Sequence, residues 1–305
     1  MKALFVGLGS IGKRHLNDLL DILTERGEQL IADRVSHSDT PVPEKLNGVI
    51  RNTYHSFEEV TDHYDCAFIC NPSALHYEAV SALIDKADNM YIEKPLYVSL
   101  DTPIDSVAWG HGIYHVACPL RFHPVISRMY ELSKQHPIVS FHAHCSSWLP
   151  GWRPGSDYRT GYSARKDLGG GVRLDLIHEL DYIHWMFGKP EKALCSFGNY
   201  GQLGIETEDT ADYILIWPDK SGTIHLDYLG GPSRRYLVFL TADGRLSRGD
   251  ILAGTVSYGE DIEILPARED IRLSEMRFFA DLLRGKASPI NNQYDGWDTL
   301  AIALE

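Results

Sequence analysis

One segment in the second half of the sequence combines a flexible backbone with two side chains that suit proton transfer. Asp175 and His178 follow three consecutive glycines at 169–171, and glycines let the backbone come close to a ligand. Oxidation of an alcohol requires removal of the hydroxyl proton as a hydride departs. Histidine suits that role because its unperturbed pKa, about 6.5, lies near the working pH of an enzyme.

Asp175 and His178 are expected on one helix, where a spacing of three residues places them on the same face. The apolar stripe of that helix lies on a different face and is formed by Leu176, Leu180, Ile183 and Phe187. The two polar side chains therefore need not enter the core.

Two further polar residues stand just past apolar segments of the first third. Asn71 follows the run 66–70, and Lys94 follows the run 90–92. Ligands of open α/β sheets gather at the carboxyl ends of the strands, so both residues are candidates for a binding site. An exposed ion pair between Lys94 and Glu93 is the competing interpretation, since such pairs are common and weak.

The N-terminal glycines predict a dinucleotide site. Residues 7–12, Gly-Leu-Gly-Ser-Ile-Gly, follow a predicted strand at 2–6 and open a predicted helix. In a G-x-G-x-x-G turn, Gly7 permits the tight turn, Gly9 lets the backbone approach a pyrophosphate, and Gly12 allows close packing of helix and strand.

The residues that follow this turn complete the predicted site. Ser10 and Ile11 begin the helix, whose free N–H groups attract a pyrophosphate. Asp33 closes the second predicted strand about 20 residues after the last glycine, where a carboxylate binds the adenosine ribose. That residue favours NAD, whereas a guanidinium at Arg34 can pair with a 2′-phosphate and leaves NADP open. A glycine turn without any nucleotide is the alternative.

Together with these glycines, three strings resemble the glucose–fructose oxidoreductase/inositol dehydrogenase (Gfo/Idh/MocA) family over essentially the whole chain. The strings are Asn-Pro-Ser-Ala-Leu-His at 71–76, Glu-Lys-Pro at 93–95 and Gly-Gly-Gly-Val-Arg-Leu-Asp-Leu-Ile-His-Glu-Leu-Asp at 169–181. The resemblance implies an NAD(P)-dependent oxidoreductase. The loop after residue 148, taken together with the string His-Glu-Leu-Asp-Tyr at 178–182, resembles a subgroup of this family that is associated with bacterial surface-sugar biosynthesis.

The family resemblance also implies roles for the residues of the first domain. Lys94 would hydrogen-bond the reacting hydroxyl and hold it near the nicotinamide. Asn71, Pro72 and His76 would line the pocket beside the dinucleotide, with Glu93 next to Lys94. A histidine that only caps or packs its own helix is the alternative for His76.

In the second domain, the resemblance implies that His178 is the general acid/base and that Asp175 contacts the substrate or orients the histidine. The family usually places the histidine four residues after the aspartate, whereas here the spacing is three. The spacing from His178 to Asp181 still fits the family pattern, which indicates a one-residue deletion between Asp175 and His178. Two alternatives stay open: Glu179 takes the catalytic position, or His178 is a structural group tied to Asp181.

Substrate recognition is expected from the loop at 148–171, which is rich in aromatic and basic residues. Aromatic rings beside guanidinium groups suit a sugar that carries a carboxylate or phosphate, and the candidates are Arg153, Tyr158 and Arg159. A solvated loop that packs its tryptophans on the domain is the alternative. Arg121, near the domain junction, is a further candidate, with an interdomain salt bridge as its competing role.

The elements that must position these residues divide the chain into two domains. In the first, apolar strand segments alternate with helical patterns; the strands are 2–6, 30–32, 66–70, 90–92 and 113–117, and the helices follow residue 10 and lie at 57–60, 75–84 and 104–109. This alternation predicts a doubly wound parallel sheet, with a Rossmann domain at 1–119.

The second domain, 120–305, is expected to be α+β and to serve in substrate binding and oligomerisation. Strand candidates at 139–146, 193–198, 213–217, 223–228 and 236–240 follow one another with few helices between them, which favours a mainly antiparallel sheet. One face of that sheet must be covered, and a homodimer or tetramer through it is expected.

Composition narrows the classes of function. The 305 residues include 29 basic and 42 acidic side chains, so nucleic acid and anionic membrane surfaces are poor partners. No apolar stretch approaches 18 residues, the N-terminus lacks a signal peptide, and five cysteines without a CxxC pair indicate neither disulfides nor a metal site. A cytoplasmic protein is expected. The sequence stops within a helical pattern, which suggests a truncated or altered C-terminus.

The leading prediction is hydride transfer between a nicotinamide and a hydroxyl or keto carbon of a sugar, sugar acid, cyclitol or nucleotide sugar. One alternative is a glycosidase that keeps NAD bound and oxidises its substrate transiently. The other is a dinucleotide-sensing regulator, which the presence of Lys94 and His178 disfavours.

Overall fold

Residues 1–36, 46, 48–266 and 270–305 are described in the structure, a computed structural model, and the chain divides into two units. Unit 1 contains Met1–Ala117 and Arg272–Trp297, and unit 2 contains Cys118–Ile271 and Asp298–Glu305. The sequence analysis placed all residues after 119 in the second domain. The structure instead groups the segment 272–297 with the first unit.

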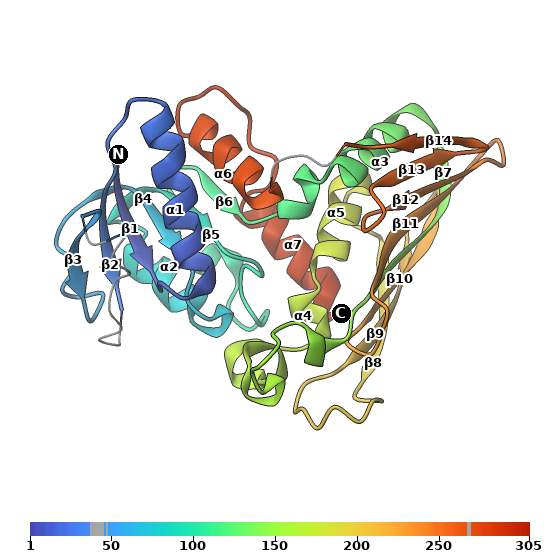
Figure 1. Ribbon diagram of the computed structural model, residues 1–305, viewed down its shortest axis with the longest axis horizontal. Helices are drawn as coiled ribbons and strands as arrows, with labels where there is room; N and C mark the ends of the chain where they lie inside the picture. Colours follow the sequence, from blue (N-terminus) through green and yellow to red (C-terminus); the bar gives the residue numbers. More distant parts are fainter. Residues whose placement is uncertain (37–45, 47, 267–269) are drawn as a thin grey trace. The chain divides into compact units, whose positions relative to one another are not determined.

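Unit 1 is built on a six-stranded sheet in the order β3-β2-β1-β4-β5-β6 (Figure 1). The strands are β1 (Lys2–Val6), β2 (Ile31–Val35), β3 (Ile50–Tyr54), β4 (Tyr64–Ile69), β5 (Ala87–Ile92) and β6 (Tyr114–Val116). All five pairings are parallel, which confirms the predicted sheet. The edge strand β3 was missed because its side chains are largely polar and at least partly exposed.

Two of the predicted helices of unit 1 are confirmed, and two are wrong. α1 (Ser10–Glu25) and α2 (His76–Leu83) connect the central strands. Residues 57–60 form a turn instead of a helix, and only a single 3-10 turn, Ile104–Ser106, stands in the segment 104–109. Both segments are too short to sustain a helix whose nucleation is costly.

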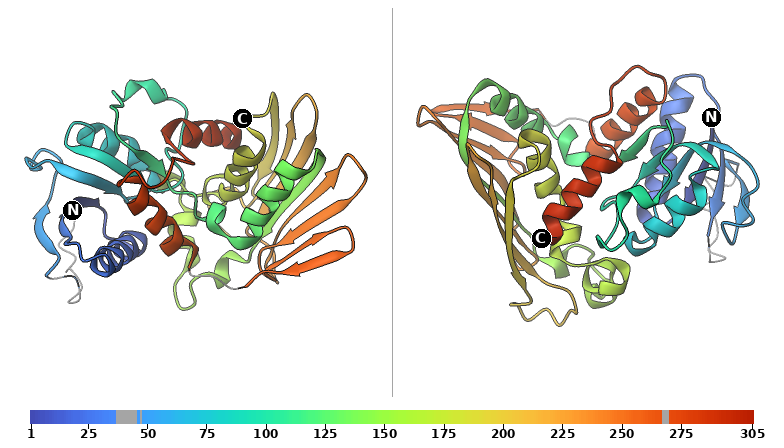
Figure 2. Two further views of the ribbon diagram at one scale, coloured as in Figure 1. Left: turned by 90° about the horizontal axis from the view of Figure 1, so that it is seen from above. Right: turned by 180° about the vertical axis from the view of Figure 1, so that it is seen from behind.

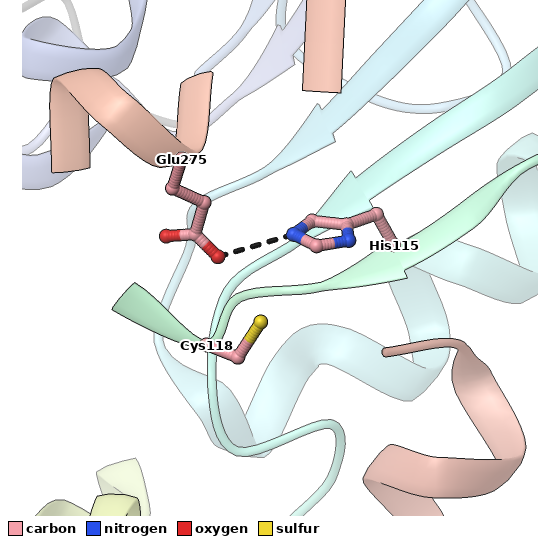
Figure 3. Close-up of side chains that lie close together, drawn as sticks. All are labelled: His115, Cys118 and Glu275. Carbon is pink, nitrogen blue, oxygen red and sulfur yellow. Dashed lines mark hydrogen bonds and ion pairs between the residues drawn. The ribbon is translucent and has the colours of Figure 1, made fainter. Parts of the chain in front are cut away.

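The late segment joins unit 1 because its apolar side chains complete that core. α6 (Ile271–Leu282) lies beside α1 in Figures 1 and 2, and Phe279 shares a buried cluster with Leu19. The side chains of Glu275 on α6 and His115 on β6, each 1% exposed, are joined by a 3.1 Å hydrogen bond between Oε1 and Nε2 (Figure 3). A buried carboxylate needs such a partner, so this contact ties α6 to the sheet edge.

Unit 2 contains an eight-stranded sheet in the order β14-β13-β12-β11-β7-β10-β9-β8. The strands are β7 (Ile138–Ser146), β8 (Lys192–Gly198), β9 (Thr210–Ile216), β10 (Ser221–Asp227), β11 (Arg234–Thr241), β12 (Leu246–Asp250), β13 (Thr255–Tyr258) and β14 (Asp261–Ile264). β7 and β10 are parallel, and the other pairings are antiparallel, as predicted.

Helices cover one face of this sheet. α3 (Pro124–Gln135) and α5 (His178–Phe187) lie along it in Figures 1 and 2, and the last turns of α7 (Gln293–Leu304) contribute to the same core. The short helix α4 (Val172–Asp175) precedes α5, and the loop before it contains four 3-10 turns. The opposite face carries no helix among the residues described.

Candidate functional site

The glycine turn between β1 and α1 has the geometry that its spacing predicts. Gly7 has a φ of +83°, and a Cβ there would lie 2.9 Å from the Cα of Asn71. A Cβ at Gly12 would lie 2.1 Å from the carbonyl oxygen of Gly7. At Gly9, by contrast, no described atom lies within 4 Å of the added Cβ. Glycine is therefore required at 7 and 12, and open space remains beside Gly9.

Helix α1 presents its N-terminus to this space. It begins at Ser10 and continues through Ile11, and no described side chain caps it at Gly9. The first turn carries no acidic residue that would neutralise the positive end of the helix dipole. The backbone N–H groups at the start of α1 are available to an anionic group such as a pyrophosphate.

The loop after β4 places one unsatisfied polar atom beside the glycine turn. The Nδ2 of Asn71 donates to the carbonyl of Leu75 at 3.2 Å, whereas its buried Oδ1 has no partner in the part of the chain that is described. Pro72 follows and is exposed. A buried acceptor without a donor is costly, so Asn71 is suited to receive a hydrogen bond from a ligand. The residues at this edge fit a dinucleotide.

The contacts of His76 favour the alternative in which it packs and holds its surroundings. Its side chain is fully buried, with Nδ1 3.0 Å from the carbonyl of Pro95 and Nε2 3.0 Å from the carbonyl of Asn71. Burial lowers the pKa of the imidazole, although the neighbouring carbonyls oppose this effect. His76 is a positioning residue that joins the loops after β4 and β5.

Glu93 is held by a residue that the sequence analysis did not consider. The Nε2 of His15, on α1 and 1% exposed, lies 2.6 Å from Oε1 of Glu93. Burial would raise the pKa of Glu93, but the bond from His15 and the charge of Lys94 outweigh it and lower that pKa. The helix of the glycine turn is thus tied to the loop that carries Lys94.

Asp33 is a structural residue, and its predicted contact with ribose is corrected. It lies in the middle of β2 and is fully buried. Its Oδ1 accepts hydrogen bonds from Arg51 Nε at 3.2 Å and Asn52 N at 2.9 Å, and its Oδ2 from Arg51 Nη2 at 2.6 Å and Tyr64 OH at 2.7 Å. Each oxygen of Asp33 accepts from two donors, so neither oxygen has an acceptor site left for a ribose hydroxyl.

Arg34 is likewise built into the sheet. It is 7% exposed, and its Nε donates to Oγ1 of Thr53 on β3 at 2.9 Å. The amide of Gly7 donates to the carbonyl of Val35, which places the end of β2 at the glycine turn. The residue that follows this strand end is Ser36, and the chain from 37 to 45 lies outside the described residues.

We expect Asp33→Asn to lower the free energy of unfolding by about 1–3 kcal/mol without changing the ratio of the Kd values for NADH and NADPH. Burial raises the pKa of Asp33, but the bonds from Arg51, Tyr64 and Asn52 outweigh it and lower that pKa. The wild-type stabilisation is therefore present above the unfolded-state pKa of about 4 and is lost as the pH falls below it.

Urea unfolding at several pH values and fluorescence titration with both cofactors measure these quantities. The variant should lose the part of the acid sensitivity that Asp33 contributes. A shift of the Kd ratio toward NADPH would instead return Asp33 to the ribose.

In unit 2, Asp175 and His178 belong to two helices, which corrects the single continuous helix of the sequence analysis. α4 ends at Asp175, Leu176 leaves helical geometry with φ −96° and ψ 27°, and α5 begins at His178. Oδ2 of Asp175 accepts a hydrogen bond from Ser163 Oγ at 2.6 Å and from Tyr228 OH at 3.2 Å. His178 therefore stands at the N-terminus of α5, directly after the break.

The acidic neighbours of His178 are both engaged by arginines. Glu179 is fully buried and accepts hydrogen bonds from Arg235 Nε at 2.7 Å and Nη2 at 2.9 Å. Asp181 accepts from Arg121 Nε at 3.0 Å and Nη2 at 2.7 Å. Bidentate pairs of this kind fix both carboxylates. This geometry disfavours Glu179 as the acid/base.

Arg121 is therefore not a substrate ligand, which corrects that prediction. Its side chain is buried, and its guanidinium lies 5.4 Å from the centre of the Trp185 ring. The bond to Asp181 joins two parts of unit 2 and is not an interdomain salt bridge.

The other three predicted substrate residues differ in their availability. The hydroxyl of Tyr158 donates to the carbonyl of Leu203 at 2.9 Å, so this group belongs to the fold. Arg159 pairs with Asp157 at 2.9 Å, but both side chains are about half exposed and such pairs exchange readily. Arg153 is exposed, and its side chain makes no ion pair with any described residue.

Sequence reasoning missed three residues that shape the candidate site. His15 is spaced three residues after Gly12, but nothing in its neighbourhood marked its contact with Glu93. Ser163 and Tyr228 hold Asp175 from a loop and from the end of β10. Such contacts between distant segments have no local signal.

Comparison with known proteins identifies two matched regions. Residues 1–107 match the model of the oxidoreductase family with an NAD-binding Rossmann fold, and residues 137–246 match the GFO/IDH/MocA C-terminal domain. Together these regions cover more than half of the chain. No helix among the described residues is long and apolar enough to cross a membrane.

Curated relatives are distant. An uncharacterized oxidoreductase of Synechocystis sp., sll0816, is 26% identical over 157 residues, which are 47% of this chain and 40% of that protein. The 2,7-anhydro-N-acetylneuraminate hydratase of Mediterraneibacter gnavus is 22% identical over 330 residues, covering 92% of this chain and 85% of the relative. The match to the first of these proteins thus spans less than half of its length.

Solved structures share the fold over the full chain. A levoglucosan dehydrogenase in complex with NADH and levoglucosan has a TM-score of 0.81 at 15% identity, with 99% of this chain and 95% of that chain covered. At this identity the likeness establishes the fold alone.

Proposed function

This chain belongs to the Gfo/Idh/MocA family of NAD-binding oxidoreductases, and we propose that it transfers a hydride between the nicotinamide and a hydroxyl-bearing carbon of a sugar, sugar acid, cyclitol or nucleotide sugar. The observation that carries the proposal is the combination of a dinucleotide edge in unit 1 with a held Asp175 beside His178 in unit 2. A role in surface-sugar synthesis is the finer form of this proposal. A cytoplasmic location, where free thiols such as the five cysteines persist, is part of it.

Unit 1 supplies the cofactor side of the reaction. When bound, NAD accepts or donates the hydride at its nicotinamide. The turn at 7–12 and the uncapped start of α1 would hold the pyrophosphate, and Asn71 would receive a hydrogen bond. Lys94, on the loop fixed by His15 and His76, would donate a hydrogen bond to the reacting oxygen.

Unit 2 supplies the group that exchanges the proton. His178 would take the hydroxyl proton in the direction of oxidation and return it in reduction. Asp175 is held by Ser163 and Tyr228 and is positioned to bind a substrate hydroxyl or to orient the imidazole. A neutral histidine is required at the start of oxidation, because it must accept the hydroxyl proton.

The experiment that tests the proposal is a titration of the protein with NADH and NADPH, followed by nicotinamide fluorescence. Binding of NADH, followed by NAD-dependent oxidation of a member of the sugar or cyclitol classes, would support the proposal. A folded protein that binds neither cofactor would refute it.

A glycosidase with tethered NAD is the second candidate. The observation that favours this candidate is the similarity to the 2,7-anhydro-N-acetylneuraminate hydratase. That relative is named for a reaction without net oxidation of the sugar. The same Lys94 and His178 would serve both reactions. Net reduction of NAD during turnover supports the dehydrogenase, whereas release of an aglycone without NADH accumulation supports the glycosidase.

We further propose that two copies associate through the outer face of the unit 2 sheet. That face carries exposed apolar side chains, including Ile214 at 48% and Leu246 at 58%, around a hollow that Leu240 also lines. Beside them, His144 stacks on Tyr236 with ring centres 4.9 Å apart. From strand spacing and length, eight strands present about 800 Å² per partner, the area of a standard interface. A two-fold dimer uses the same face on both copies.

Size-exclusion chromatography with light scattering is expected to show a dimer or tetramer at micromolar concentration. The double substitution Ile214→Glu and Leu246→Glu should produce a monomer that still binds NADH, because unit 1 is unchanged. A monomeric wild-type protein would refute the interface.

A further inference from the structure

One tryptophan of unit 2 lies at the surface with its polar end satisfied. The indole of Trp152 is 37% exposed, and its Nε1 donates to Oγ of Ser147 at 2.7 Å. By contrast, Trp217 is 7% exposed in the core, and Trp185 stacks on Tyr130 at 3.9 Å between ring centres. Trp148 is also exposed, at 47%, so it is the contacts of Trp152 and not its exposure alone that single it out.

The exposed indole is connected to the candidate catalytic residues through one buried ring. Trp152 meets Tyr228 edge to face, with ring centres 5.4 Å apart and an interplanar angle of 88°. Tyr228 is fully buried, and its hydroxyl donates to Asp175 at 3.2 Å. The chain Trp152–Tyr228–Asp175 is therefore continuous from the surface to the carboxylate.

Hydroxyl groups border this indole. Ser147 accepts the Trp152 N–H, and its Oγ lies 3.4 Å from Oγ of Ser233. The bond from Trp152 Nε1 fixes the orientation of the ring, so little side-chain entropy remains to be lost when a ligand lies on it. An apolar face beside polar groups matches a sugar ring, which presents C–H groups on one side and hydroxyls at its edge.

We propose that Trp152 is the stacking platform for the sugar or cyclitol ring of the substrate, with Ser147 and Ser233 at the ring edge. This inference rests on the proposed function and adds the residue that positions the ring. The platform lies within unit 2, as do Tyr228 and Asp175.

The test compares Trp152→Ala with Trp152→Phe in the NADH-loaded protein. Saturation-transfer NMR is recorded with levoglucosan, myo-inositol and UDP-N-acetylglucosamine, and KM and kcat are measured for each compound that turns over. Trp152→Ala should raise KM about tenfold and remove the saturation transfer, with kcat and NADH affinity within about twofold of wild type. Trp152→Phe keeps an aromatic face and should remain within about threefold of wild-type KM.

Tyr200→Ala is the matched control, because Tyr200 is an exposed aromatic residue of the same unit, at 67%. It should change neither KM nor the saturation transfer. An unchanged KM in Trp152→Ala, or the absence of saturation transfer from the wild-type protein to all three compounds, would overturn the platform. Failure of the proposed function is distinct: the wild type would then bind neither NADH nor NADPH.

Discussion

Lys94→Ala is expected to lower kcat/KM about 10³-fold while the Kd for NADH stays within about twofold of wild type. The lysine stands at the carboxyl end of β5, on a loop fixed by His15 through Glu93 and by His76 through Pro95. Its ammonium group would stabilise charge that develops on the substrate oxygen, an interaction stronger in the transition state than in the ground state. The loss should therefore appear mainly in kcat.

Lys94→Arg and Lys192→Ala are informative controls. Arginine keeps the charge but has a planar, longer head group, so it should recover only part of the activity. Lys192 is exposed at the start of β8 in unit 2, and its removal should leave turnover unchanged. Full activity in Lys94→Ala, measured in a protein that still binds NADH, would contradict the proposed mechanism.

The glycine turn could be predicted from the sequence because its cause is local. A positive φ at Gly7 and the close approach of Gly12 to the carbonyl of Gly7 depend on residues within one turn. Strand, turn and helix are contiguous, and their hydrophobic patterns are visible at once. The parallel sheet of unit 1 followed from the same alternation.

The ribose position could not be predicted in this way, because it depends on where β2 ends. Spacing from the glycines pointed to Asp33, but the bond from Gly7 N to Val35 O places the strand end two residues later. β2 is buried from Ala32 to Val35, so a residue two positions before the strand end lies inside the sheet and not at its edge. The buried charge of Asp33 is balanced by Arg51 on β3, a strand that the sequence analysis did not predict.

In unit 2, the five predicted strands correspond to β7–β11, whereas β12, β13 and β14 were missed. β13 and β14 contain only four residues each, and β12 carries a single large apolar side chain, so none of them gives an apolar pattern long enough to mark a strand. The packing of α6 against unit 1 also depends on residues that are far away in the sequence. The core that α6 packs against is formed more than 200 residues earlier, and a single sequence carries no pairing signal for this contact.

The Glu179–Arg235 pair is expected to dominate the stability of unit 2. Glu179→Ala should lower the free energy of unfolding by about 3–5 kcal/mol, because it leaves the Arg235 guanidinium without its carboxylate partner. Burial would lower the pKa of Arg235, but the charge of Glu179 outweighs it and raises that pKa. In the variant this charge is gone, but arginine is not deprotonated in proteins, so Arg235 stays charged and urea unfolding should report the full cost.

The same pair separates a structural role for Glu179 from a catalytic one. Replacing both partners, as Glu179→Leu with Arg235→Met, removes both charges and should recover most of the stability lost in Glu179→Ala. If His178 is the acid/base, the double variant keeps kcat within about tenfold of wild type, whereas His178→Ala lowers it about 10²–10⁴-fold. The opposite result, a stable double variant without activity beside an active His178→Ala, would move the proton transfer to Glu179.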